Sequence, residues 1–189
     1  MASSISDITP KLRAYSTTAI VLHWTSGMTF LGMLSLGWYM TWLEDQPGSV
    51  WYFDLHKSLG LLVGVLIGMR LLWRVAHRPY PYPSSMARWQ ITAARASHGL
   101  LYLTMLAMPL LGLAGADLSQ DGLAFFGHTI WQPLGVHKFA SELLFSLHSA
   151  AAWTLVSLIV LHVCAALLHL RVFRDGVFER MWLRRSQRP

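Results

Sequence analysis

Four histidines lie inside long apolar stretches of the sequence and are its clearest chemical signal. They are His23, His56, His148 and His162. Polar side chains inside apolar spans are costly and are often functional. Imidazole is also the commonest metal-binding side chain in proteins. The sequence therefore predicts a ligand-binding site in an apolar setting.

The spacing of these histidines places them in two layers. His148 and His162 are 14 residues apart, which corresponds to about 21 Å of helix and a rotation roughly 40° short of four full turns. They therefore share one face of a helix at two depths. The order of the apolar stretches places His56 at the depth of His148 and His23 at the depth of His162. We call His23 and His162 the inner pair, and His56 and His148 the outer pair.

Two imidazoles that face each other inside a helical bundle suit the axial positions of a haem iron. Zinc prefers four ligands of mixed type, and a di-iron site needs inward-facing glutamates, which the apolar stretches lack. The single cysteine, Cys164, excludes a four-cysteine centre. The alternative is that each histidine is an ordinary hydrogen-bonding residue between helices.

Two arginines support the inner site. Arg70 follows His56 by 14 residues, which places it on nearly the same helix face at the depth of the inner pair. An arginine there needs a partner, and a haem propionate is a natural one. Arg74, one turn later, is a second candidate. The alternative is that both side chains extend to the lipid head groups.

Small residues occur beside these sites, including Gly60, Gly64 and Gly68. They leave room for a flat macrocycle, or they allow two helices to pack closely, and the two interpretations are compatible.

The composition predicts the elements that must position these residues. Apolar residues make up 54% of the 189 residues and charged residues 13%, whereas soluble domains carry about 25% charged residues. Four stretches are long enough to cross a bilayer, near residues 17–42, 53–75, 96–116 and 143–170. We expect an all-α fold, an integral membrane four-helix antiparallel bundle. Its parts are an N-terminal tail at 1–16, the bundle at 17–170 and a basic C-terminal tail at 171–189.

The charges indicate the orientation of these spans. The two tails and the second connection with its helix ends hold 13 of the 15 basic residues, and only Lys57 and Lys138 fall on the other side. By the positive-inside rule, both termini are cytoplasmic. The net charge of +6 is explained by this topology, so we expect no nucleic-acid partner. The first residues lack the features of a cleaved signal.

The residues resemble the bacterial cytochrome b561 proteins, a family of four-helix di-haem b cytochromes that includes superoxide oxidase. The matching segments are IVLHW at 20–24, LHKSLG at 55–60, MRLLWR at 69–74, HGLLY at 98–102, MPLLG at 108–112, LHS at 147–149 and LHVCAALLH at 161–169. The resemblance implies two haem b groups in a bacterial inner membrane, with the inner and outer pairs as axial ligands. It also matches His98 and His169, which we expect to line a quinone pocket beside the inner haem, with His98 at the start of its span.

A haem with two axial histidines has no open iron position and passes electrons. We therefore expect electron transfer between a periplasmic donor and quinone in the lipid bilayer. The resemblance makes superoxide a candidate donor and ubiquinone a candidate acceptor, which would make the protein a superoxide:ubiquinone oxidoreductase. Lys57, beside outer ligand His56, is a candidate to attract the anion. The alternative is a cytochrome b anchor that passes electrons for a partner dehydrogenase or cytochrome.

Overall fold

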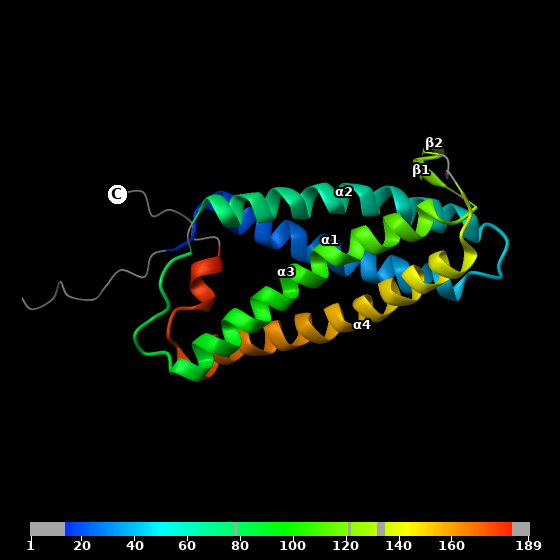
Figure 1. Cartoon of the computed structure of the whole chain (residues 1–189). Helices are drawn as coiled ribbons and strands as arrows, with labels where there is room; N and C mark the ends of the chain where they lie inside the picture. Colours follow the sequence, from blue (N-terminus) through cyan, green and yellow to red (C-terminus); the bar gives the residue numbers. More distant parts are fainter. Residues whose placement is uncertain (1–13, 78, 121, 132–134, 183–189) are drawn as a thin grey trace, which may run out of the picture.

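The computed structural model describes residues 14–77, 79–120, 122–131 and 135–182. Most of the predicted N-terminal tail, at 1–13, and the end of the basic C-terminal tail, at 183–189, lie outside the described residues. Four long helices form an antiparallel bundle (Figure 1). They are α1 (Thr17–Trp42), α2 (Ser49–Ala76), α3 (Arg88–Asp117) and α4 (Lys138–Leu168). The expected fold class, an all-α four-helix bundle, is confirmed.

All four helices are long and apolar enough to cross a membrane. Large apolar side chains cover their outer surfaces, including Leu72 and Leu103, which are 73% and 64% exposed. A soluble bundle would bury such side chains. Lipid is therefore the solvent that this surface fits.

Three of the predicted spans begin too late. The structure starts α2 at Ser49, α3 at Arg88 and α4 at Lys138, where the sequence predicted 53, 96 and 143. Arg88 and Arg95, expected in the second connection, are helical, and so is Lys138, expected in the third. Apolar content marks only the membrane-crossing part of a helix, whereas these helices begin one or two turns before it.

The third connection, between the third and fourth predicted spans, contains an antiparallel β-hairpin. Strand β1 (Leu123–Phe125) pairs with β2 (His128–Trp131) through a turn in which Phe126 and Gly127 both have positive φ. Two such residues make the turn that matches the twist of paired strands. The backbone N–H of Phe126 donates to the buried hydroxyl of Ser58 at 2.9 Å. This bond fixes the hairpin to α2.

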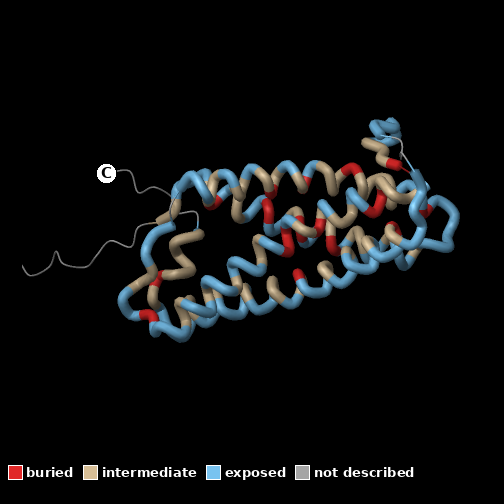
Figure 2. The backbone as a smooth tube through the Cα atoms, in the orientation of Figure 1, coloured by how far each residue is buried: buried red, intermediate tan, exposed pale blue. Residues whose placement is uncertain are grey.

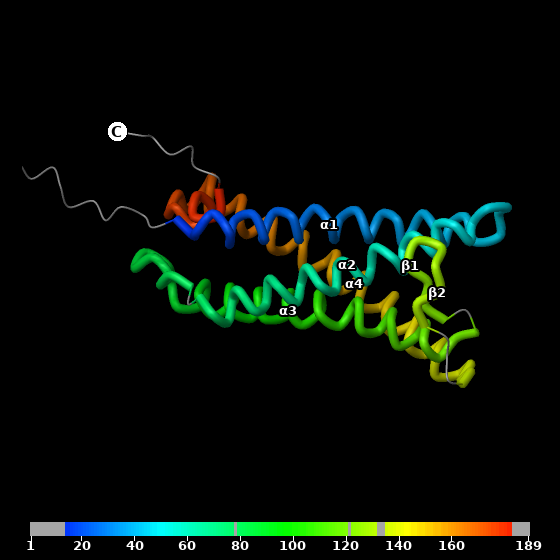
Figure 3. The backbone as a smooth tube through the Cα atoms, turned by 90° about the horizontal axis from the view of Figure 1, so that it is seen from above, coloured from blue at the N-terminus to red at the C-terminus, as the bar shows by residue number. Residues whose placement is uncertain are grey.

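The two ends of the bundle differ. The hairpin and the α1–α2 connection lie at one end, which we call the outer end (Figure 3). At the opposite, inner end, the π-helix η1 (His169–Phe173) extends α4, and the 3-10 helix η2 (Phe178–Met181) folds back onto α1. Trp24 Nε1 donates to the carbonyl of Met181 at 2.8 Å. The first part of the expected C-terminal tail is therefore a cap on the inner end.

The buried core lies at the middle of the bundle (Figure 2). It draws on all four helices and consists of Phe30, Leu34, Val63, Ile67, Met105, Met108 and Leu155. In sequence, Leu155 falls midway between His148 and His162. The core thus separates the inner pair from the outer pair with close-packed apolar side chains.

Candidate functional site

Both histidine pairs predicted from the sequence face each other in the structure. The ring centroids of His23 and His162 are 6.0 Å apart, and those of His56 and His148 are 6.1 Å apart. The inner pair joins α1 to α4, and the outer pair joins α2 to α4. Because α4 is one continuous helix between its two histidines, the pairs lie about 21 Å apart along its axis.

This separation has a chemical meaning. Two imidazoles on opposite sides of one metal, with metal–nitrogen bonds of about 2 Å and ring centres ~1 Å beyond each nitrogen, have centroids roughly 6 Å apart. Edge-to-face ring contacts span the same range of centroid distances, so this spacing fits axial ligation without requiring it. Both pairs therefore have the spacing of axial ligands, with the rings at 56° and 81° to each other.

Backbone and glycine contacts position the outer pair. The Nδ1–H of His148 donates to the carbonyl of Met108 at 2.9 Å. A Cβ at Gly112 would lie 3.3 Å from the His148 ring, and one at Gly37 would lie 3.4 Å from the His56 ring. The two glycines thus let neighbouring helices approach both imidazoles closely.

One ring nitrogen of the outer pair lacks a hydrogen bond to any residue that the structure describes. The Nδ1 atom of His56 is buried and has no hydrogen-bond partner among the described residues. A buried polar atom without a partner is unfavourable. Such an atom in a ring that already faces a second imidazole fits a site built to hold an additional group.

Side chains from all four helices surround the inner pair. Arg70 on α2 donates from Nη2 to His23 Nδ1 at 3.0 Å. Its guanidinium also lies 5.5 Å from the ring centre of Tyr102 on α3. The ring of His98, also on α3, is 5.3 Å from that of His162. The structure therefore places Arg70 at the inner pair, as its spacing from His56 predicted.

The expectation that His98 starts its span is wrong. Helix α3 begins ten residues earlier, at Arg88. His98 consequently lies level with His162, and the two rings are in contact. His169, its expected companion, lies about 10 Å further along α4 and contacts Asp175.

Other predicted site residues have simpler surroundings. Arg74 lies in the last turn of α2. Lys57, expected to attract an anion, forms an ion pair with Asp54 at 3.8 Å. Gly64 packs against Pro109, where a Cβ would lie 3.5 Å from the proline ring, whereas a Cβ at Gly68 would meet no atom within 4 Å. Close helix packing therefore explains Gly64, and Gly68 faces open space.

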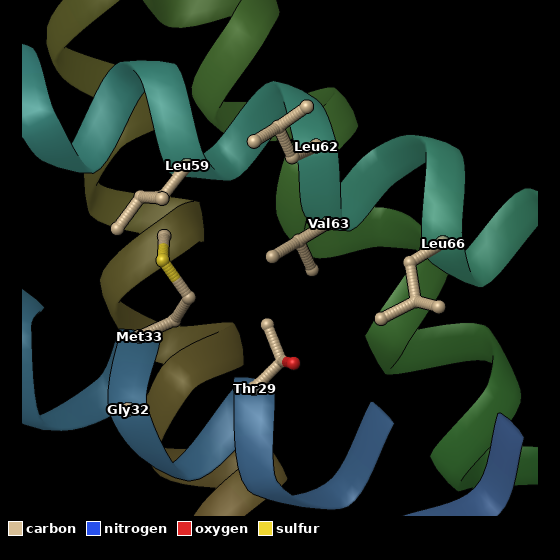
Figure 4. Close-up of a pocket in the computed structure, with 7 residues that line it drawn as sticks. All are labelled: Thr29, Gly32, Met33, Leu59, Leu62, Val63 and Leu66. Atoms are coloured by element: carbon tan, nitrogen blue, oxygen red, sulfur yellow. The ribbon is translucent and has the colours of Figure 1, made fainter. Parts of the chain in front are cut away.

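An apolar groove of about 420 Å³ lies between α1 and α2 (Figure 4). Its lining consists of Thr29, Gly32, Met33, Leu59, Leu62, Val63 and Leu66. None of these side chains is titratable, and Met33 is the one residue among them whose side chain can ligate a metal. The groove is thus an apolar surface between two helices, and the titratable side chains described above lie outside its lining.

A sequence profile described as prokaryotic cytochrome b561 matches residues 14–184. The chain belongs to this family. The resemblance drawn from the sequence is thus confirmed. Members of the cytochrome b561 family bind haem b and transfer electrons within the membrane. The family and the four long apolar helices together fit a bacterial membrane protein.

Three relatives extend over nearly the whole chain. "Cytochrome b561 homolog 2" of Escherichia coli is 32% identical over 172 residues, covering 88% of this chain and 90% of the relative. "Cytochrome b561 homolog 1" of the same organism is 32% identical over 185 residues, covering 93% and 100%. The "Probable superoxide oxidase CybB" of Yersinia pestis is 26% identical over 172 residues, covering 89% and 96%.

Several neighbours of the site were not predicted from the sequence. Tyr102, Gly37 and the carbonyl of Met108 contact site residues only because separate helices meet. Asp175 is different, since it lies six residues after His169 in a stretch that we interpreted as a basic tail. Asp175 is an acidic residue among arginines just after a span, and this was the one sequence signal that could have indicated its role.

Proposed function

We propose that this cytochrome holds two haem b groups, one at each histidine pair. His23 and His162 would ligate the inner iron, and His56 and His148 the outer iron. The observation that carries this proposal is the centroid separation of 6.0 and 6.1 Å in the two pairs. When bound, each haem supplies one-electron redox chemistry with both axial positions filled by protein.

We propose that two arginines bind the propionate groups of the inner haem. Arg70 already reaches the inner pair, and Arg74 lies one turn further toward the inner end of α2. Guanidinium groups bind carboxylates through paired hydrogen bonds. A propionate would also give the membrane-embedded charge of Arg70 the partner that its position requires.

The proposed reaction is electron transfer from a donor at the outer end to quinone near the inner end. His98 contacts the inner ligand His162, and His169 lies at the end of the same helix. The two imidazoles would bind the quinone head group and exchange protons with it. We propose ubiquinone as the quinone.

Superoxide is the proposed outer donor. One relative carries the name of a probable superoxide oxidase, and Lys57 lies directly after the outer ligand His56 in α2. The ion pair with Asp54 reduces the charge that Lys57 offers to an anion. The relative therefore supports the choice of superoxide more strongly than Lys57 does.

The test is a two-step reaction of the purified cytochrome. A superoxide-generating system should reduce the haem, and superoxide dismutase should abolish that reduction. A ubiquinone analogue should then reoxidise the haem within seconds. Reduction that persists with dismutase would exclude superoxide, and a failure of reoxidation would exclude the quinone step.

The proposed orientation places both termini in the cytoplasm. The inner end carries Arg74, Arg171 and Arg174, and the outer end carries Glu44 and Asp45. This distribution follows the positive-inside rule. A C-terminal reporter that fluoresces only in the cytoplasm should be active, and a periplasm-specific reporter at the same position should be silent.

The hairpin favours a second candidate function, that of an anchor for a partner redox subunit. Phe126, Ile130 and Trp131 are each about half exposed at the outer end, and exposed apolar side chains often mark protein contacts. Purification in mild detergent distinguishes the two functions. A stoichiometric soluble partner would favour the anchor, and an isolated cytochrome that reacts with quinone would favour independent electron transfer.

A further inference from the structure

A largely buried imidazole–carboxylate pair occurs at the inner end, separate from the proposed haem ligands. Nδ1 of His169 lies 2.6 Å from Oδ2 of Asp175, and the two side chains are only 12% and 7% exposed. The other carboxylate oxygen accepts the backbone N–H of Val177 at 3.2 Å. Both oxygens of Asp175 thus have defined partners.

The local backbone is shaped to make this pair. The regular turns of α4 give way to the π-helix η1, and Arg174 follows in the left-handed conformation with a φ of 49°. The N–H of Arg174 returns to the carbonyl of His169 at 2.8 Å. The chain therefore reverses direction. As a result, Asp175 contacts the ring of His169, which lies six residues earlier in the sequence. Short π-helical turns are frequent at functional sites.

The carboxylate of Asp175 determines which nitrogen of the His169 ring can exchange a proton. Because the carboxylate accepts from Nδ1–H, the ring is held in one orientation and Nε2 is the atom left to exchange a proton. Asp175 also balances the positive charge that the ring carries when both nitrogens are protonated. Arg171 and Arg174 are exposed beside the pair, which places it close to the water at this end.

We propose that His169 and Asp175 form a proton-transfer pair that protonates quinone. This inference rests on the proposed quinone reduction and adds to it the source of the protons and the role of Asp175. Reduction of a quinone to a quinol takes two electrons and two protons. In each proton transfer, the Nε2–H bond of His169 breaks and an O–H bond forms on a quinone oxygen. The ring then regains a proton from water at the inner end, and Asp175 remains a carboxylate.

In these roles, His169 is a catalytic residue and Asp175 is a positioning residue. The variants Asp175→Asn and His169→Gln remove the charge and the proton donor with little change in size. Asp45→Asn is the matched control, because Asp45 is exposed in the α1–α2 connection at the opposite end. Haem content should be unchanged in all three variants, since none of these residues is a proposed ligand.

The experiment is stopped-flow reoxidation of the pre-reduced, full-length cytochrome in detergent. One arm uses a water-soluble ubiquinone analogue, and the other uses ferricyanide, which takes an electron without a proton. Reoxidation by quinone should slow about 100-fold in His169→Gln and about 10-fold in Asp175→Asn. Ferricyanide rates and the Asp45→Asn control should match the unmodified protein. The quinone arm of Asp175→Asn should also show a larger rate difference between H₂O and D₂O.

Three results would overturn the inference. Quinone rates equal to those of the unmodified protein in both variants would remove the proton-transfer role. Equal slowing with ferricyanide, or loss of haem, would make the pair a structural element of the inner end. An unmodified protein that quinone does not reoxidise would instead defeat the proposed quinone reaction itself, together with this inference.

Discussion

The inner and outer histidine pairs have nearly the same spacing but are held in different ways. Backbone and glycine contacts hold the outer pair: the Met108 carbonyl accepts from His148, and Gly112 lies against the same ring. Charged and polar side chains surround the inner pair: Arg70 contacts His23, and His98 contacts His162. One site is therefore defined by main-chain shape and the other by electrostatics.

The difference affects how ready each pair is to bind iron. His148 donates from Nδ1–H, which leaves the lone pair of Nε2 free for a metal. In His23 the situation is reversed, because a guanidinium has only donors and its partner Nδ1 must accept. The proton of neutral His23 then lies on Nε2. Ligation through Nε2 therefore requires Arg70 to release His23, and a propionate offers it a new partner.

In the proposed two-haem arrangement, the difference would also give electron transfer a direction. A cation beside the proposed inner haem would stabilise its reduced state, because reduction lowers the positive charge there. The outer pair contacts glycines and a carbonyl, and the neighbouring cation, Lys57, is paired with Asp54. We therefore expect the inner haem to have the higher potential, so that electrons move from the outer end toward the quinone.

The largest expected effect comes from removing one ligand of each pair. His148→Ala should eliminate the outer haem and His162→Ala the inner haem, so that each variant binds one haem per chain instead of two. The apolar core between the layers should keep the other site intact. The measurement is a pyridine haemochrome assay of purified protein. His128→Ala, in exposed strand β2, is the control and should retain both haems. Loss of both haems from either ligand variant would contradict two independent sites.

Arg70→Gln should have an intermediate effect that is confined to the inner haem. Removing the cation should lower the inner midpoint potential by about 60 mV, the equivalent of a tenfold change in a one-electron equilibrium constant. The outer potential should change little. A redox titration followed by optical absorbance measures both values, and Arg95→Gln, in the first turns of α3, is the control. An unchanged inner potential would remove the proposed electrostatic difference between the sites.

Gly112→Ala should have the smallest effect, confined to the outer haem. The new Cβ would lie 3.3 Å from the His148 ring, so the ring must shift by a few tenths of an ångström. We expect a change in the low-temperature EPR signal of one haem, with both haems retained. Gly99→Ala is the matched control, because a Cβ there meets no atom within 4 Å. A change in both signals, or equal changes in the two variants, would show that Gly112 does not act on the outer pair alone.

The sequence predicted the helices and the histidine pairs because both depend on regular periodicity. Fourteen residues are close to four helical turns, so the relation of His148 to His162 follows from the rise and rotation of one helix. The position of Arg70 follows from its spacing to His56 in the same way. Polar helix ends were missed, since apolar content does not mark them, and the position of His98 was therefore wrong.

The contacts that distinguish the two pairs could not be predicted. The Met108 carbonyl reaches His148 only because α3 and α4 pack closely at Gly112. The contact between His169 and Asp175 depends on a π-helical turn and a left-handed residue, and neither has a strong sequence signal. Periodicity places residues along one helix, whereas these contacts depend on how close two segments come.

The most direct test of the central claim is the number of haems bound by the unmodified protein. We would purify the full chain from cells supplied with a haem precursor, and measure haem by pyridine haemochrome and protein by amino-acid analysis. The account predicts two b-type haems per chain, one for each histidine pair. A ratio of one would show that one pair is not a haem site, and a ratio of zero would contradict the account as a whole.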